Sequence, residues 1–488
     1  MALKTLFKQT AIYGLATVLP RVLSFLLVRL HTGENVLQST AQYGDVSLIY
    51  SYFVLFNVVL AYGMETAFFR FFNKEPHPQK VISTSAISLI ISSVLFLIIG
   101  LLFQQQIADW TNLKVEYIRL VVWILLLDAL VIIPFAWLRA NQKALRYALL
   151  KIINVLVNVG LNLFLLLSLK NLASETSFWS SLYKPGWEVN YIFIANLIAS
   201  ALTLVLLLPF YLKIKYTFDS ALWKKMMRYA LPVLIAGVAF SINEAFDRIL
   251  LERLLPENIA KSEIGIYSAC YKLAVFMTLF ATAYKLGVEP YFFSHAKEKN
   301  PQKNYALILE YFVIFGSVIL LGVVVFADVL KVLLIGDETY WQAMTIVPVI
   351  LLANLCLGIY HNLSVWYKIT DKTLTGAYIS IVGAIITLVA NILLIPHIGY
   401  IGSALATLAA YGTMMICSYF LGKKHYPIPY NLPKIGLYMG SSILFSALTF
   451  YVFDRNIWVG IPLLLIFLTL VFFVEKNRLK SIFLKNEN

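Results

Sequence analysis

The feature that most constrains this chain is a hydrophobic segment of roughly 20 residues that recurs along its whole length of 488 residues. About 20 apolar residues are needed for a helix to cross a hydrocarbon core roughly 30 Å thick. Hydrophobic residues make up 60% of the sequence and charged residues only 13%, whereas charged residues make up about a quarter of a soluble domain. We therefore predict an all-α polytopic membrane protein with about 14 transmembrane helices, near residues 9–30, 43–66, 82–103, 117–138, 147–169, 189–212, 229–251, 264–288, 305–327, 341–365, 374–395, 399–421, 434–453 and 456–474.

The charges between these segments predict the orientation of the chain. The loops at 70–81, 139–146, 213–228, 294–304, 366–373 and 422–433 are basic, as are both termini, and the alternate loops are acidic or neutral. Because Lys and Arg collect on the cytoplasmic side of membrane proteins, both termini are expected to be cytoplasmic. The net charge of +14 is thus explained by topology and does not indicate a nucleic-acid partner.

The sequence contains no pattern that indicates an enzyme, a cofactor or a bound metal. Its three cysteines lie in apolar segments without metal-ligand spacing, and there is no Walker motif and no H-E-x-x-H run. The longest loop on the predicted outer side, 170–188, is too short and too poor in charge for a catalytic domain. We expect a protein that is neither an enzyme nor an ATPase, with Na⁺ or H⁺ as the only possible coupling ion.

An internal repeat predicts two similar halves. The pattern G-x-E-x-x-F-F occurs at 63–69 and again at 287–293, an offset of 224 residues, and Pro20 with Pro232 and Asn162 with Asn391 keep comparable offsets. Such repeats in transporters mark lobes that move about a central site. We expect an N-lobe at 1–215, a C-lobe at 216–424, and a two-helix hairpin with a cytoplasmic tail at 425–488.

Two further runs resemble a known group of transporters. Asp247-Arg248 followed by the run from Gly265 to Lys272, and the run from Asn391 to Pro396 followed by Gly399, Gly402 and 404–407, are similar to the polysaccharide-exporter branch of the multidrug/oligosaccharidyl-lipid/polysaccharide (MOP) superfamily. The resemblance covers essentially the whole chain. It implies a flippase of the bacterial inner membrane that moves a polyprenyl-diphosphate-linked oligosaccharide, such as an O-antigen or capsule precursor, to the outer leaflet. It also implies membrane lipids and glycan-assembly enzymes as partners, and a monomer.

Three cationic residues inside predicted helices are candidates for binding the diphosphate of such a lipid. Arg21 and Arg29 lie in the first helix without an acid, and Lys272 lies in the eighth. A charge within the membrane costs on the order of 3 kcal/mol unless it has a partner or a function, and guanidinium groups suit phosphate oxygens. The run from Arg21 to Phe25 also resembles a cavity-facing run of lipid II flippases. Alternatively, Arg21 pairs with a glutamate, Arg29 reaches the outer interface, and Lys272 pairs with Asp247 or Glu244.

The resemblance also suggests an ion site, formed by Asp247, Asn391 and Thr407. Glu244 and Arg248 are spaced to neutralise each other on one helix face, which would leave Asp247 unpaired. Oxygen ligands of this kind suit a hard cation, but a polar clamp between helices explains the same residues.

Four charged residues are expected at gates or lobe contacts: Glu65, Glu289, Glu244 and Arg248. Glu65 and Glu289 occupy equivalent repeat positions, beside Arg70 and Lys285 respectively. A role for Asp128 in the fourth helix stays open.

Two other functions remain possible for such a chain. A multidrug or cation antiporter would share the fold, but cationic drugs require acidic cavity groups, and the arginines of the first helix argue against them. A membrane polymerase or glycosyltransferase would require a catalytic cluster on an extramembrane loop. The expected function is therefore lipid-linked glycan translocation, with the glycan itself undetermined.

Overall fold

The computed structural model describes residues 14, 18–20, 22–34, 36–294, 300–370 and 372–484. Thirteen helices in this part of the chain are long and apolar enough to cross a membrane, from Thr40–Phe72 to Ile457–Lys476. They coincide with the second to fourteenth predicted spans. Nine of the 22 residues of the first predicted span, 9–30, lie outside the described residues, and residues 22–31 are helical. The prediction of an all-helical, polytopic membrane protein is confirmed.

The helices follow one another through the chain with short connections. In the first half they are α2 (Thr40–Ala61), α3 (Met64–Phe72), α4 (Pro78–Leu102), α5 (Gln104–Thr111), α6 (Val115–Leu130), α7 (Ile132–Ala140), α8 (Ala144–Leu163), the π-helix η1 (Phe164–Ser168), α9 (Leu169–Glu175), α10 (Ser177–Leu182) and α11 (Glu188–Leu212). In the second half they are α12 (Ser220–Leu254), α13 (Glu257–Tyr271), the 3-10 turn η2 (Lys272–Ala274), α14 (Val275–Ser294), α15 (Pro301–Val325), α16 (Ala327–Leu334), η3 (Glu338–Ile346), α17 (Val347–Leu363), α18 (Val365–Ile369), α19 (Thr373–Ile398), α20 (Tyr400–His425), α21 (Leu432–Ala447), η4 (Leu448–Val452) and α22 (Ile457–Leu484).

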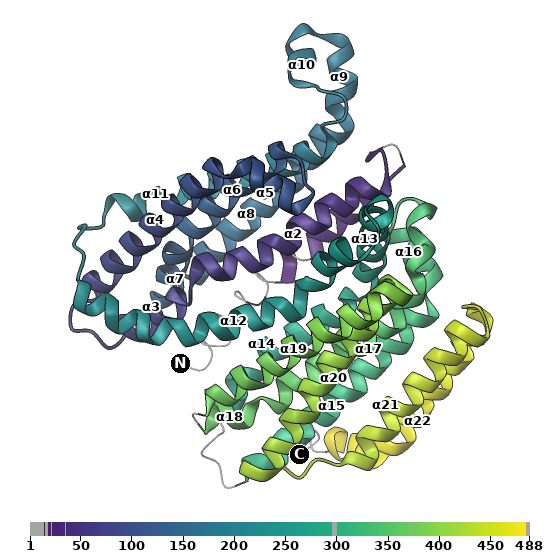
Figure 1. Cartoon of the computed structure of the whole chain (residues 1–488). Coiled ribbons are helices and arrows are strands. Elements are labelled where there is room, and N and C mark those ends of the chain that lie inside the picture. Colours follow the sequence, from purple (N-terminus) through teal and green to yellow (C-terminus); the bar gives the residue numbers. More distant parts are fainter. Residues whose placement is uncertain are drawn as a thin grey trace.

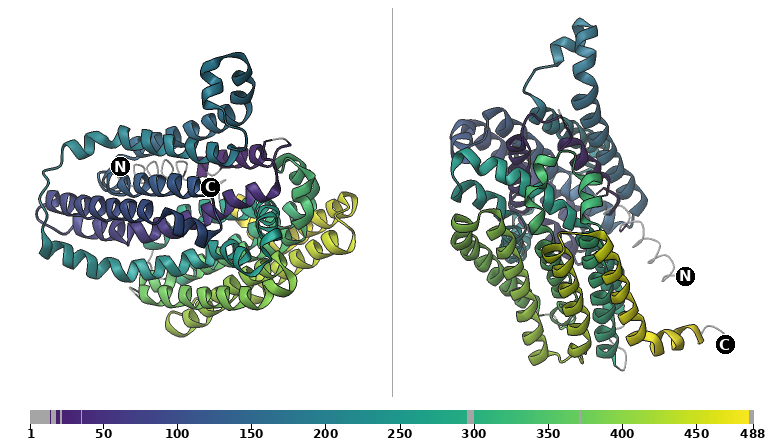
Figure 2. Two further views of the ribbon diagram at one scale, coloured as in Figure 1. Left: turned by 45° about the horizontal axis from the view of Figure 1, so that its top comes forward. Right: turned by 90° about the vertical axis from the view of Figure 1, so that its right-hand side faces the viewer.

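The helices form one bundle that α2, α12 and α13 cross between two groups of helices. Figure 1 shows α4, α6, α8 and α11 on one side of these crossing helices and α15 and α17–α20 on the other. The last helices, α21 and α22, pack along α15 on the flank of the bundle. Both views in Figure 2 show α9 and α10 standing out from one end of the molecule, so the segment expected to be a loop at 170–188 is largely helical.

A break between α2 and α3 brings α12 close to the second predicted span. Gly63 has a φ of +72°, and a Cβ there would lie 2.4 Å from the carbonyl oxygen of Ala230. Only glycine tolerates both the left-handed backbone and this approach. Its repeat counterpart Gly287 lies within α14, where an added Cβ would meet no atom of a described residue within 4 Å. The repeated motif therefore breaks the helix at one of its two positions only.

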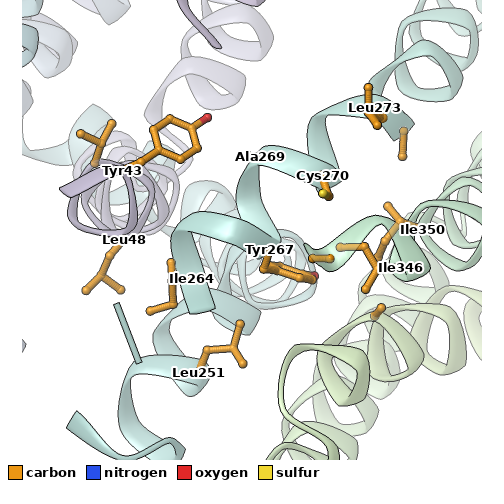
Figure 3. Packing of buried hydrophobic residues seen from close by; sticks show 14 of the residues in the cluster. Tyr43, Leu48, Leu251, Ile264, Tyr267, Ala269, Cys270, Leu273, Ile346 and Ile350 are labelled. Carbon is orange, nitrogen blue, oxygen red and sulfur yellow. The ribbon is translucent and has the colours of Figure 1, made fainter. Parts of the chain in front are cut away.

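The largest buried cluster is centred on α13. Ile264, Tyr267 and Cys270 are fully buried there, between Leu48 of α2 and Ile350 of α17 (Figure 3). In a membrane, where lipid is as apolar as the core, helices associate through close packing and interhelical hydrogen bonds. The packing of α13 therefore holds together helices from both halves of the sequence.

Candidate functional site

One end of the bundle is closed by a very close contact between α2 and α13. A Cβ on Gly44 would lie 1.9 Å from the carbonyl oxygen of Lys261, and one on Gly265 would lie 2.0 Å from that of Thr40. Small residues at a helix contact allow backbones to approach in this way. The loop charges predict this end to be external, so the structure is closed on the predicted outer side.

Polar contacts reinforce the same closed end. The hydroxyls of Thr40 and Ser262 are 2.6 Å apart, and the Lys261 ammonium lies 2.8 Å from the Asp45 carboxylate. Each pair joins α2 to α13. Contacts that oppose an opening motion at one end of a transporter are what a gate requires.

Arg29, which we expected at the diphosphate, takes part in a neighbouring contact. Its Nη1 donates a hydrogen bond to the carbonyl oxygen of Ile335, at 2.8 Å, just after α16. The backbone N–H of Gly336 donates to the hydroxyl of Thr32, also at 2.8 Å. In this conformation Arg29 therefore joins the first helix to the second half of the chain, and its role in substrate binding stays a prediction.

A polar cavity of about 540 Å³ lies among the helices of the first half and is bordered by α12. It reaches Glu65 and Thr66 at the start of α3, beyond the end of α2 that is opposite to the closed contact. Because α2 has 22 residues, these two ends are about 33 Å apart. Half of the lining residues are polar or charged: Asn57, Glu65, Thr66, Asp128, Lys151, Asn154, Asn196, Ser200 and Thr203. The structure thus combines a closed predicted outer end with a polar cavity nearer the other end.

The charges at this cavity are arranged differently from our expectation. Glu65 forms a salt bridge with Arg139 of α7, not with Arg70. The guanidinium of Arg70 instead lies 4.2 Å from the ring centre of Tyr229 in α12. The partner of Glu65 therefore comes from its own half of the chain, and it is Arg70 that contacts α12.

Two further charged residues, Asp128 and Lys151, lie in the cavity wall. They attract each other electrostatically but form no salt bridge in the described part of the chain. Asp128 accepts a hydrogen bond from the Ser200 hydroxyl, at 2.9 Å. Lys151 attracts Asp128 electrostatically, and its ammonium lies 4.4 Å from the ring centre of Phe135. Sequence analysis left Asp128 unassigned and missed Lys151. Lys151 could have been identified from the sequence, since a lysine within a predicted span needs a partner or a water-filled cavity.

Asp247 is paired, contrary to the expected pattern. Its carboxylate accepts hydrogen bonds from Arg248 Nη1, at 2.8 and 3.1 Å, and from the hydroxyl of Tyr267, at 2.7 Å. The expected side-chain pair of Glu244 with Arg248 is replaced by a 3.5 Å contact from Arg248 to the Glu244 backbone oxygen. Successive helix residues point in different directions, but the long arginine side chain reaches back to its neighbour.

The three residues expected to bind a coupling ion are each hydrogen-bonded to other residues. No hydrogen bond joins Asp247 to Asn391 or Thr407 among the described residues. Asn391 accepts from the Ser403 hydroxyl, at 2.7 Å, and Thr407 donates to the Ser403 backbone. Both oxygens of Asp247 already have donors, so a Na⁺ ion would have to displace Arg248. These hydrogen bonds fit an interhelical clamp, and a role of the three residues in ion coupling stays a prediction.

The remaining predicted residues differ in whether the structure describes them. Lys272 is exposed at the helix interruption η2, within electrostatic range of Glu244 and Arg248. Arg21 lies outside the described residues, as does the side chain of Glu289. No role is tested for any of them, and their assignments stay predictions.

Comparison with solved structures defines the class of fold. The chain is similar to "Lipid II flippase MurJ, inward closed conformation", with a TM-score of 0.74 at 16% identity over 95% of this chain and 99% of that chain. An inward-facing multidrug resistance MATE family transporter has a TM-score of 0.64 at 12% identity, over 85% of this chain and 94% of that chain. A MOP superfamily transporter from Pyrococcus furiosus, described as having a binding pocket of reverse polarity, has a TM-score of 0.62 at 13% identity, over 86% of this chain and 95% of that chain. The chain therefore shares the fold of these solved transporters.

The sequence places the chain more narrowly. The family described as "Polysaccharide biosynthesis protein" matches residues 6–295, well over half of the chain. The chain belongs to this family. No curated protein matches the sequence significantly.

Proposed function

We propose that this protein is a flippase that carries a lipid-linked precursor of a cell-surface polysaccharide from the inner to the outer leaflet of the bacterial cytoplasmic membrane. The family match carries the proposal, because that family belongs to polysaccharide biosynthesis. The likeness to a lipid II flippase over nearly the whole of both chains supports it. The lipid carrier is a polyprenyl diphosphate, whose tail stays in the bilayer while the headgroup crosses.

The mechanism that we propose is alternating access between two lobes, at 1–215 and 216–424, with 425–488 as an appended hairpin. The close contact of Gly44 with α13 and of Gly265 with α2 supports a state that is closed on the outer side. The polar cavity nearer the opposite end supports entry of a headgroup from the cytoplasm. Closing of that end and separation of α2 from α13 would then release the headgroup outside.

The cavity chemistry favours this function over export of cationic drugs. A cation exporter needs unpaired acidic groups in its cavity. Here Glu65 pairs with Arg139, and Asp128 is opposed by Lys151. The diphosphate of the carrier is expected to meet Arg21 and Lys272.

A comparison of two substrates in proteoliposomes tests the proposal. One preparation contains a fluorescent polyprenyl-diphosphate oligosaccharide, and the other is loaded with a cationic dye. We expect the protein to expose the lipid-linked glycan to a quencher in the opposite compartment and to leave the dye in place. Export of the dye without movement of any lipid-linked glycan would instead establish the antiporter alternative.

A further inference from the structure

The wall of the 540 Å³ cavity carries a lysine, Lys151, whose ammonium donates no hydrogen bond to a described residue. Lys151 lies seven residues after the start of α8 at Ala144, about 10 Å along the helix and so within the membrane span. Its ammonium contacts the ring of Phe135 but has no hydrogen bond or salt bridge with a described residue. A lysine held in this way within a membrane is a functional residue by default, because its insertion is costly.

Two other polar groups in the same wall also carry atoms that form no hydrogen bond with a described residue. Oδ1 of Asp128 accepts from Ser200, whereas Oδ2 accepts no hydrogen bond from a described residue. The side-chain amide of Asn57, on α2, likewise has no hydrogen-bond partner in the part of the chain that the structure describes. An ammonium only donates, a carboxylate only accepts, and an amide does both. A ligand that satisfies all three must itself carry donors and acceptors close together, as vicinal sugar hydroxyls do.

The balance of charge excludes ionic groups as the preferred ligand of this wall. Glu65 is neutralised by Arg139, and the remaining acid and base, Asp128 and Lys151, balance each other. A diphosphate would gain the attraction of Lys151 but meet the repulsion of Asp128, and a cation would meet the reverse. A neutral hydroxyl-rich group meets neither penalty. The cavity volume also lies within the range of about 300–1,000 Å³ that is typical of small-molecule sites.

We propose that this cavity binds the neutral sugar residues of the lipid-linked glycan, with Lys151, Asp128 and Asn57 hydrogen-bonded to sugar hydroxyls. The inference rests on the proposed function and deepens it, because it separates the sugar site from the diphosphate. Lys151 then contributes to glycan affinity and not to recognition of the lipid carrier.

Binding to the purified full chain in nanodiscs tests this assignment. The probes are a polyprenyl diphosphate that carries a neutral oligosaccharide and the same polyprenyl diphosphate without sugar. Lys151→Met is expected to weaken binding of the glycan-bearing lipid about tenfold, since a hydrogen bond to a charged group is lost. Its affinity for the sugar-free lipid is expected to stay unchanged. Lys143→Met is the matched control, because Lys143 is exposed at the start of the same helix and outside the cavity.

A second variant guards against misfolding of the first. Asn57→Leu removes an amide without breaking any hydrogen bond to a described residue, and it is expected to show the same selective loss. Equal loss of both lipids in the Lys151 variant would assign the cavity to the diphosphate and overturn the inference. Unchanged binding of both lipids in both variants would also overturn it. If the wild type binds and moves no lipid-linked glycan at all, the proposed function itself fails.

Discussion

Enlarging the contact between α2 and α13 by one methyl group should open the closed end of the molecule. In Gly265→Ala the new Cβ would lie 2.0 Å from the Thr40 carbonyl oxygen, whereas ordinary contacts begin at 3.4 Å. The oxygen belongs to the backbone of α2 and the Cβ is bonded directly to the backbone of α13, so the helices must separate by about 1.4 Å, the difference between these two distances. The Thr40 and Ser262 hydroxyls, now 2.6 Å apart, would then lie about 4 Å apart, beyond hydrogen-bonding range.

The expected free-energy cost follows from the contacts that are lost. The hydroxyl hydrogen bond contributes about 1 kcal/mol. The ion pair of Lys261 with Asp45, stretched by the same amount from 2.8 Å, contributes up to about 1 kcal/mol. Together these weaken the closed state by about 2 kcal/mol, which corresponds to a roughly 30-fold change in the ratio of closed to open molecules.

Cysteine labelling measures this ratio. In a chain whose three native cysteines are replaced, Ile264→Cys places a thiol at a position of α13 that is fully buried in the closed state. A membrane-impermeant maleimide should label it roughly 30-fold faster when Gly265→Ala is also present. Gly160→Ala is the control, because a Cβ there meets no atom within 4 Å in the part of the chain that the structure describes. Equal labelling rates with Gly265 and with Ala at this position, in folded and monodisperse protein, would refute the reasoning.

Two other predictions concern buried charges. Replacement of Na⁺ by choline should leave transport unchanged, because hydrogen-bond donors already occupy both carboxylate oxygens of Asp247. A strict Na⁺ requirement in proteoliposomes would contradict this prediction. Lys434→Met should lower the thermal unfolding temperature, because Lys434 of α21 bridges the buried carboxylates of Glu310 and Glu475. Removal of one partner of a buried ion pair costs about 3–5 kcal/mol. Lys423→Met, an exposed change at the end of α20, should leave the temperature unaltered.

The membrane spans could be predicted from sequence because each depends on a local property. An apolar segment of sufficient length must become a helix in lipid, where every backbone polar group needs an internal partner. The break at Gly63 could not be predicted from its motif, since the same motif leaves α14 unbroken at Gly287. What differs is the approach of Ala230, a contact between residues far apart in the chain.

The charge pairs of the candidate site could not be predicted either, because they too depend on contacts that helical spacing does not determine. Helical spacing favoured a pair of Glu244 with Arg248, but the arginine bonds to Asp247 and is held against Tyr267, whose ring centre lies 5.4 Å from the guanidinium carbon. Likewise, proximity in sequence favoured Arg70 as the partner of Glu65, whereas the structure supplies Arg139 from α7. Pairing of charges in a bundle depends on which helices pack together, and a single sequence does not contain that information.

Reversible locking of the closed end tests most directly whether the protein moves lipid-linked glycans by alternating access. Thr40→Cys with Ser262→Cys replaces two hydroxyls that are 2.6 Å apart by two thiols. Translocation of a fluorescent polyprenyl-diphosphate oligosaccharide in proteoliposomes should proceed in the reduced protein, stop when the disulfide forms, and resume on reduction. Translocation that continues through the locked state, or that is absent in both states and in the wild type, would contradict the account.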